Sequence, residues 1–585
     1  MELNLIDASI VIFYLAGVAL LGFFIQKKAS ANLDNYYLAG RNVPWWMLGI
    51  AGCSSYIDIG GTMAMVGALF YLGLKSVWMT HIFWGWFMIA GYMAFQAKWI
   101  RRSGVMTFAE WNETRFGKNR DAEMARLASA IFLLVLMIFN LIYIAVGIGK
   151  FAEAFFPISR WAATLIVFGV VGLYVTLAGF YGVIITDMVQ TVLIAAGAVL
   201  LTVIIFTNGI GTGLAETHPG GWSQLAPTWN LWEGFQETTP ASYQHFELFG
   251  PLLFIGFGWM IFRVLAGPNV WDFQFFLSAR SSRDAALAGG MWTVGYTIRW
   301  FLGVAFLVLG IYYLGPSAGF DAEKIMPMVL INLPVGIAGL FMAVLLAALM
   351  STLDAMINVT SNVVVNDFIK RYFMRKLSEK KIIRIGQLAS VFALLLGFIF
   401  SLAFQNIISA WETMLFIVVT MILVPATLRW HWWRYSGKAF VFSMIGTAAF
   451  IAFQKLFLGS VTATNSLGIN VLASLVISIS MGLIFKPTDK DVLVAFYSRI
   501  KPFGFWRPIR RAAVEQGLVP ANNREPFWDA LNGLIVPVFQ FSLALVPFYM
   551  FLRNWNKFWL WLGIAALVAF VLYFTWYRKL PEKGT

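Results

Sequence analysis

Charged residues, cysteine and histidine are all scarce in this sequence. Asp, Glu, Lys and Arg make up 12% of the 585 residues, whereas soluble globular proteins carry about 25%, so the chain cannot cover itself with a water-exposed surface. The single cysteine, Cys53, excludes a disulfide within the chain. The four histidines are scattered, and there is neither a His-Glu-x-x-His motif nor a nucleotide-binding loop, so we expect no enzyme and no catalytic residues.

Apolar runs dominate the chain instead. Hydrophobic residues make up 60% of it, and the mean hydropathy is +0.76. Runs of about 20 apolar residues, each long enough to cross a bilayer, recur along the whole length and number about fifteen. The first run, 5–26, lacks the basic start and cleavage site of a signal peptide, so we expect a retained helix. The sequence therefore predicts an all-α polytopic membrane protein.

The net charge of +14 reflects topology. If the N-terminus lies outside, most Lys and Arg residues fall in cytoplasmic loops, above all in 98–126, 370–384 and 486–524, as the positive-inside rule requires. The C-terminus is then cytoplasmic as well. None of these loops is long enough to form a basic nucleic-acid-binding domain, so we expect a lipid bilayer and no nucleic acid as a partner.

Two of the expected spans are interrupted at membrane depth. In the second span, 53–62 combines hydroxyls, a carboxylate and a glycine pair, and in the seventh, 256–268 holds three glycines and a proline around Arg263. Such breaks are tolerated where the backbone is buried or lines a cavity. The two spans are five positions apart, so they correspond if spans two to six and seven to eleven are repeats. Paired interruptions in matching halves indicate the binding site of a secondary transporter. Glycines that allow close helix packing are the alternative explanation.

Several charged residues lie inside apolar spans, where one Asp or Arg costs about 2.5–3.5 kcal/mol. Asp58, Arg263, Arg299 and Asp354 fall within spans two, seven, eight and nine, and Asp187 lies near the inner end of the sixth. Residues of this kind are functional candidates by default. A structural ion pair between Asp58 and one of the two arginines is the alternative.

Three motifs carry a resemblance to a known family. Residues 36–41 (Tyr-Tyr-Leu-Ala-Gly-Arg) with 44–46 (Pro-Trp-Trp) form the first, and Thr186-Asp187 with Gln190 forms the second. The third begins at 350–353 (Met-Ser-Thr-Leu) and continues to Asp367. These segments resemble the start of the first core helix, the acidic motif of the fifth and the serine-rich eighth core helix of the sodium:solute symporter family. The likeness covers at least 36–371.

The resemblance implies a five-plus-five inverted-repeat core with one extra helix before it and about four after it. The chain then divides into 1–43 (the first extra helix and a cytoplasmic loop), 44–207 (the first repeat), 208–246 (an external loop), 247–428 (the second repeat) and 429–585 (the C-terminal extra helices, with the basic cytoplasmic segment 486–528).

The resemblance also implies where Na+ binds. The family's conserved sodium site corresponds here to Ser54, Ile57, Ala348, Ser351 and Thr352. For the last two, hydroxyls bonded back to their own helix are the alternative. A second sodium site, found in some members, corresponds to Asp187. Its usual serine partner is here Asp354, and two neighbouring carboxylates either strengthen cation binding or share a proton.

The expected function is sodium-coupled uptake of a small polar solute by alternating access. The positions aligned with the sugar contacts of hexose-transporting relatives are Gly61, Thr80, Phe262 and Tyr296. The polar residues of those relatives are missing here, so we do not expect a hexose pocket built on the familiar pattern. The charged residues instead favour an amino acid, an organic acid or an acidic sugar. The expected solute-binding residues are Tyr56, Asp58, Gly61, Thr62, Thr80, His81, Trp259, Phe262, Arg263, Tyr296 and Arg299.

Two questions stay open at this point. A solute sensor that acts through a separate partner protein is the alternative function, and the sequence does not distinguish a monomer from a homodimer. The short loops and the lack of a sorting signal favour the inner membrane of a bacterium.

Overall fold

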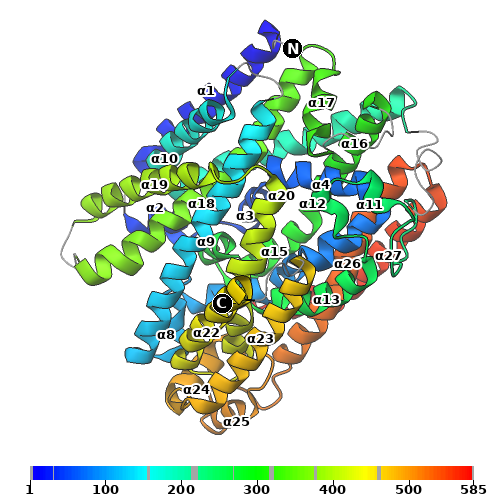
Figure 1. The fold of residues 1–585 in the computed structure, drawn as a ribbon. Helices are drawn as coiled ribbons and strands as arrows, with labels where there is room; N and C mark the ends of the chain where they lie inside the picture. The colour runs from blue at the N-terminus through cyan, green and yellow to red at the C-terminus, as the bar shows by residue number, and fades with distance from the viewer. Residues whose placement is uncertain are drawn as a thin grey trace.

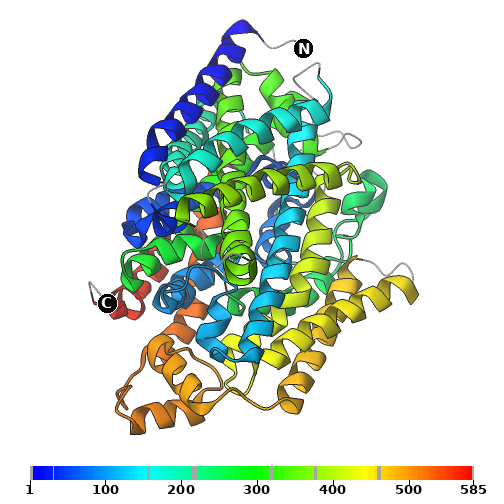
Figure 2. The same ribbon diagram turned by 90° about the vertical axis from the view of Figure 1, so that its left-hand side faces the viewer.

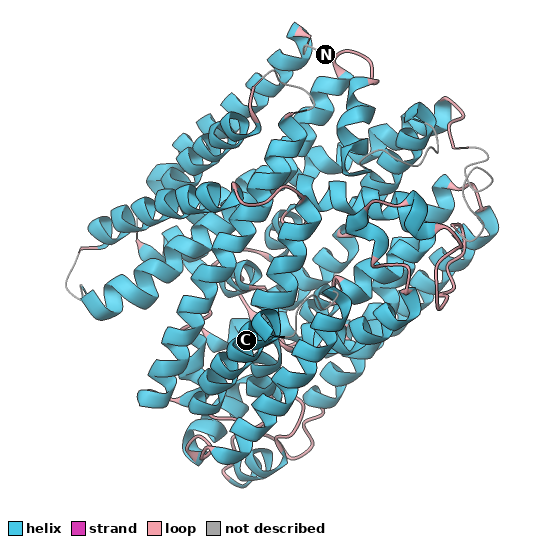
Figure 3. Cartoon of the chain, viewed as in Figure 1, coloured by secondary structure: helices cyan, strands magenta, loops and turns pink. Residues whose placement is uncertain are grey.

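The computed structural model describes residues 4–29, 32–153, 158–211, 222–267, 269–314, 322–373, 378–457 and 463–582. Within these ranges the chain forms helices and loops and no strand (Figure 3). The expectation of an all-helical membrane protein is therefore confirmed.

The first third of the chain contains ten α-helices. They are α1 (Leu5–Ala29), α2 (Leu33–Leu38), α3 (Trp45–Ser54), α4 (Ile59–Leu72), α5 (Ser76–Trp78), α6 (Met88–Gly91), α7 (Ala97–Ser103), α8 (Trp111–Phe116), α9 (Arg120–Ala152) and α10 (Arg160–Thr207).

The middle third contains eleven more. They are α11 (Phe235–Thr238), α12 (Ala241–Gln244), α13 (Phe249–Leu265), α14 (Val270–Ser278), α15 (Ser282–Gly295), α16 (Thr297–Leu314), α17 (Ile325–Ile331), α18 (Ile337–Val363), α19 (Glu379–Ser401), α20 (Ile407–Thr413) and α21 (Thr420–His431).

The last part contains α22 (Gly437–Phe457), α23 (Ala463–Ile484), α24 (Lys490–Ile500), α25 (Arg507–Glu515), α26 (Glu525–Phe551) and α27 (Trp555–Thr575). Short 3-10 turns occur at Ala39–Arg41, Gly73–Lys75, Ala322–Lys324 and Tyr577–Lys579. Segments of π-helix occur at Met79–Phe83, Tyr92–Gln96, Val364–Phe373 and Met414–Val419.

Eleven helices in the described ranges are long and apolar enough to cross a membrane, so the chain is a multi-pass membrane protein. The sequence-based number of about fifteen spans stays a prediction, because several expected spans do not run as single helices. The second and seventh expected spans are broken, and α10 joins two expected spans across a kink at Gly179, where φ is +53°. A side chain at Gly179 would meet the carbonyl of Tyr36 at 2.7 Å.

The helices outside the expected core flank it on different sides. The helix α1 packs against α10 and α18, whereas α26 and α27 pack on each other and α26 contacts α16. Figure 1 shows α1 at the upper left and α27 at the right, and the turned view in Figure 2 keeps α1 at the edge of the molecule. The helices α22 and α23 form a further pair beside α9 and α21.

The close packing of α3 on α15 depends on Gly52. A Cβ added there would overlap the indole ring of Trp292, which is buried and donates its Nε1–H to the carbonyl of Leu48 at 2.9 Å. Because a bulky ring held by a hydrogen bond does not move aside easily, Gly52→Ala is expected to destabilise the protein by about 1–3 kcal/mol. The melting temperature in detergent measures this. Gly258→Ala is the matched control, since a Cβ at Gly258 meets no atom within 4 Å, and equal melting temperatures would contradict the expectation.

Candidate functional site

The first helix break lies between α3 and α4. The helix α3 ends at Ser54 and α4 begins at Ile59, so the expected interruption within 53–62 is present. Asp58 has extended backbone angles (φ −85°, ψ 158°) and caps α4 by accepting a hydrogen bond from the N–H of Gly61 at 2.5 Å. The phenol of Tyr143 donates to the same carboxylate oxygen at 2.8 Å. The break is therefore a capped, buried turn.

The serine-rich part of α18 faces this break. Ser351 donates its hydroxyl to Oγ of Ser54 at 2.7 Å, and Thr352 donates to the carbonyl of Ser55 at 3.1 Å. The hydroxyl of Thr352 also lies 3.3 Å from the carbonyl of Ala348. Four of the five residues expected at the first sodium site therefore lie in or beside one buried cluster of oxygens.

Ile57, the fifth of these residues, lies on the same turn. Its N–H donates to the carbonyl of Ser54 at 2.8 Å, and its side chain is fully buried. The structure adds Ser55 to this group, since its carbonyl is the one that Thr352 reaches. Oxygens of this kind, from carbonyls and hydroxyls, are hard ligands suited to a hard cation.

The two carboxylates of the possible second sodium site are both fully buried. Asp354, on α18, accepts hydrogen bonds from Tyr174 at 2.8 Å and from Thr186 at 3.5 Å. Within the described residues, neither carboxylate oxygen of Asp187 has a hydrogen-bond donor, and neither does Oδ1 of Asp354. Asp354 lies near enough to repel the charge of Asp187. Two buried carboxylates this close, with unpaired oxygen atoms, either bind a cation or share a proton.

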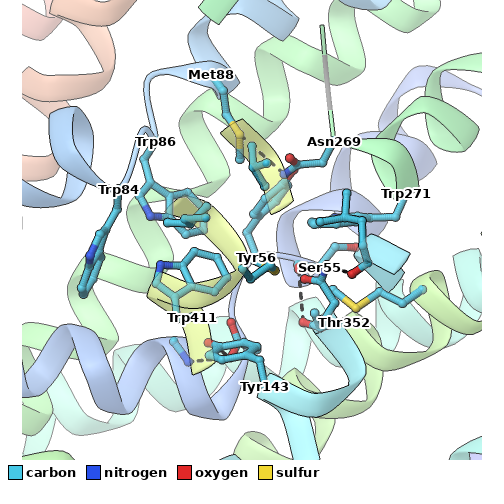
Figure 4. Close-up of a pocket in the computed structure, with 18 of the residues that line it drawn as sticks. Ser55, Tyr56, Trp84, Trp86, Met88, Tyr143, Asn269, Trp271, Thr352 and Trp411 are labelled. Carbon is cyan, nitrogen blue, oxygen red and sulfur yellow. Dashed lines mark hydrogen bonds between the residues drawn. The ribbon is translucent and has the colours of Figure 1, made fainter. Parts of the chain in front are cut away.

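A small cavity lies beside the broken segment (Figure 4). Its volume is about 50 Å³, which holds only a few waters. The lining residues are Ser55, Tyr56, Asp58, Gly61, Ala64, Trp84, Trp86, Met88, Leu136, Asn140, Tyr143, Arg263, Asn269, Trp271, Arg299, Thr352, Met356, Trp411, Met414, Leu415 and Val419. Thr352 thus touches both the oxygen cluster and the cavity.

Five of the eleven expected solute-binding residues line this cavity, namely Tyr56, Asp58, Gly61, Arg263 and Arg299. The other six are placed outside its lining, namely Thr62, Thr80, His81, Trp259, Phe262 and Tyr296. Their contact with a solute therefore stays a prediction that this cavity does not support.

Ring packing explains why some of these six residues lie outside the cavity lining. The imidazole of His81 stacks on the indole of Trp300, with ring centroids 5.5 Å apart, and it bonds to the carbonyl of Val77. Tyr296 stacks on Trp86 at 4.9 Å. Both rings therefore form part of the wall behind the cavity.

The two arginines of the cavity have different surroundings. Arg299 donates from Nη1 to the carbonyl of Tyr56 at 2.8 Å, and its guanidinium lies over the ring of Trp86 at 4.7 Å. Arg263 donates to Oδ1 of Asn269 at 3.3 Å, and its Nη2 lies 2.8 Å from the sulfur of Met88. The described residues include no ion pair between Asp58 and either arginine.

Several residues in and around the site were not expected from the sequence. Asn269 follows the break between α13 and α14, and its position there was a usable signal. Asp272, on α14, is fully buried and accepts hydrogen bonds from Tyr56 and Tyr92. Its charge within an apolar run was a signal as well. The tryptophans Trp84, Trp86, Trp271 and Trp411 gave no such signal, because tryptophan is common throughout the chain.

An all-helical membrane protein with two broken helices, a buried oxygen cluster and an adjoining cavity has the organisation of a secondary transporter. The chain belongs to the sodium:solute symporter family, whose family model matches residues 36–446. This assignment confirms the resemblance seen in the motifs. The family consists of sodium-coupled transporters, so sodium-coupled symport is the class of activity.

Curated relatives agree with this assignment. The chain is 24% identical over 486 residues to the sodium/glucose cotransporter of Vibrio parahaemolyticus, covering 77% of this chain and 86% of that protein. It is 26% identical over 407 residues to the high-affinity proline transporter PutP of Bacillus subtilis, covering 67% and 78%.

A solved structure supports the fold. It shows a Na+-coupled sialic acid symporter in a substrate-bound outward-open state, with a TM-score of 0.64 and 19% identity, covering 83% of this chain and 99% of the other. At this identity the likeness concerns the fold alone.

Proposed function

We propose that this protein is a sodium-coupled secondary active symporter that imports a small, charged polar solute by alternating access. An amino acid, an organic acid or an acidic sugar fits the proposal better than a neutral hexose. In this proposal, 44–207 and 247–428 form the inverted repeats, 1–43 and 429–585 contribute the extra helices, and 208–246 is external. We place the protein in the inner membrane of a bacterium.

The contact between α18 and the first helix break carries the proposal. Ser351 meets Ser54 and Thr352 meets the carbonyl of Ser55, although 297 positions separate the partners in each pair. A sodium ion bound by these oxygens and by the carbonyls of Ile57 and Ala348 holds the two repeats together. Solute capture next to it is thereby coupled to the sodium gradient.

The orientation of the chain is part of the proposal. The helices α24 and α25, which belong to the basic segment 486–528, lie at the lower end of the molecule in Figure 1, and the N-terminus lies at the upper end. By the positive-inside rule the lower end faces the cytoplasm. The N-terminus is then external and the C-terminus cytoplasmic.

Asp187 and Asp354 form the proposed second sodium site. Both carboxylate oxygens of Asp187 and Oδ1 of Asp354 lack donors within the described residues. Asp187 lies beside the first site, since Ser54 donates to its carbonyl at 3.4 Å. With this second site, two sodium ions are transported in each transport cycle.

Uptake into proteoliposomes tests the proposed function. An inward sodium gradient is expected to drive accumulation of the solute, and sodium and solute are expected to raise each other's affinity by the same factor. Thermal stabilisation by amino acids, organic acids and acidic sugars, with and without sodium, identifies the solute. Uptake that follows a proton gradient and ignores sodium would refute the ion assignment. Binding without accumulation would favour a solute sensor instead.

A further inference from the structure

The cavity lining has more unpartnered hydrogen-bond donors than acceptors. Four buried N–H groups of lining side chains have no partner within the described residues, namely Nε1 of Trp84 and Trp271 and Nε of Arg263 and Arg299. One buried acceptor, Oδ1 of Asn140, and one hydroxyl, that of Ser55, lack partners too. Because unpaired buried polar groups are costly, this excess of donors favours a ligand rich in acceptors.

The charge of Arg299 is largely offset inside the cavity. Its Nη2 and Oδ2 of Asp58 both lie within 2.7 Å of the point where a Cβ of Gly61 would stand, so the two opposite charges are neighbours. The other oxygen of Asp58 is already held by Gly61 and Tyr143. Arg299 and Asp58 together therefore present little net charge to a ligand.

Arg263 is left without an acidic partner in the lining. Its hydrogen bonds go to a neutral amide oxygen and to a thioether sulfur, which is a weak acceptor. Asp272, outside the lining, lies close enough to attract the charge of Arg263, but it is bonded through Oδ2 to Tyr56 and Tyr92. Within the described residues it forms no direct ion pair with Arg263. A buried guanidinium is stabilised most by an anion that it can bind through two N–H groups.

The rest of the lining is mostly aromatic and apolar. Trp84, Trp271, Trp411, Tyr143 and Met356 surround the cavity (Figure 4). The amide N–H groups of the lining are already engaged, since Nδ2 of Asn140 donates to its own helix and Nδ2 of Asn269 donates to the hydroxyl of Tyr56. A solute with many hydroxyl groups would leave most of them unpaired here.

We propose, on the basis of the proposed symport function, that the solute is a carboxylate with an apolar or aromatic body. The carboxylate binds the guanidinium of Arg263, and the body lies among the tryptophans after the cavity, which holds only a few waters in this structure, has widened. Arg299 acts as a positioning residue, because it ties the carbonyl of Tyr56 in the break to the wall of the cavity. A free carboxylic acid and an apolar amino acid share this chemistry.

Four compounds of similar shape distinguish the possibilities. They are 3-phenylpropionate, its amide, 3-phenylpropylamine and phenylalanine. In the presence of sodium, each compound is tested for thermal stabilisation of the full-length protein and for uptake into proteoliposomes. The carboxylate is expected to bind at least about 10-fold more tightly than the amide or the amine. Preference for 3-phenylpropionate over phenylalanine identifies a free acid, and the reverse preference identifies an amino acid.

Variants at Arg263 test the anchor. Arg263→Gln is expected to remove the preference for the carboxylate over the amide, and Arg263→Lys to keep part of it. Arg160→Gln is the matched control. Both arginines lie over a tryptophan ring, Arg263 over Trp259 and Arg160 over Trp161, but Arg160 is not part of the cavity lining. Stabilisation by sodium alone shows that each variant is folded.

The outcomes separate this inference from the symport proposal. If sodium stabilises the wild type but no carboxylate binds at millimolar concentration, or the amide binds equally well, the inference is wrong and the symport proposal stands. An unchanged preference in Arg263→Gln also refutes the inference. If sodium has no effect on the wild type, the symport proposal itself fails.

Discussion

Replacing Ser351 and Thr352 together by alanine is expected to abolish the sodium dependence of solute binding and uptake. In the proposed first sodium site, these hydroxyls join the carbonyls of Ser54, Ile57 and Ala348, so the variant loses two of the expected oxygen ligands. A polar contact to a charged group contributes about 1.5–3 kcal/mol to the free energy of binding. Losing two such contacts weakens sodium affinity by at least about 100-fold.

The half-saturating sodium concentration for uptake measures this effect, and sodium-dependent thermal stabilisation measures it without transport. Thr360→Ala is the control on the same helix, since Thr360 is buried and bonds only to the carbonyl of Met356 at 2.8 Å. The two variants lose similar side chains from α18. If their sodium affinities are the same, the oxygen cluster at the break does not hold the driving ion.

Asp187→Asn is expected to remove the cooperative dependence of uptake on sodium. The carboxylate oxygens of Asp187 have no donor within the described residues, and the charged side chain of Asp354 lies nearby. Two buried negative charges so close together are strongly destabilising unless a cation binds between them or they share a proton, and we assign a sodium ion to this place. We expect the Hill coefficient for sodium to fall from about 2 to about 1, as for the loss of one of two coupled sites.

Asp354→Ser is the informative comparison, because serine is the residue that the family resemblance implies at this position. The Asp354→Ser variant keeps an oxygen ligand for sodium and removes one of the two carboxylate charges, so the Hill coefficient for sodium is expected to stay near 2. Initial uptake rates at a fixed solute concentration give the coefficient for each variant. A wild-type coefficient near 1, or an unchanged coefficient in Asp187→Asn, argues against a second sodium site.

The class of protein and the position of the first break were predictable from the sequence. Few charges and recurring apolar runs are properties of the chain itself, and they require a membrane. The break was expected within 53–62 and is found where α3 ends at Ser54 and α4 begins at Ile59. Asp58 and Gly61 determine it locally, since a carboxylate that caps a helix start acts on an N–H three residues away.

The cavity was only partly predictable. Residues close to the breaks, such as Tyr56, Asp58 and Arg263, line it as expected. His81 and Tyr296 do not, because they stack on Trp300 and Trp86. No sequence pattern shows which side of a buried helix faces a neighbouring ring, since every side of such a helix is apolar.

The sequence by itself determined that this is a helical membrane protein with broken spans and the motifs of a sodium:solute symporter. Hydropathy, helix caps and motifs act over a few residues, so they can be read along the chain. Only the tertiary structure decided that Ser351 meets Ser54, and that Arg299 has Asp58 beside it while Arg263 has no acidic partner in the cavity. Those contacts join helices far apart in the chain, and packing alone sets which of their faces meet.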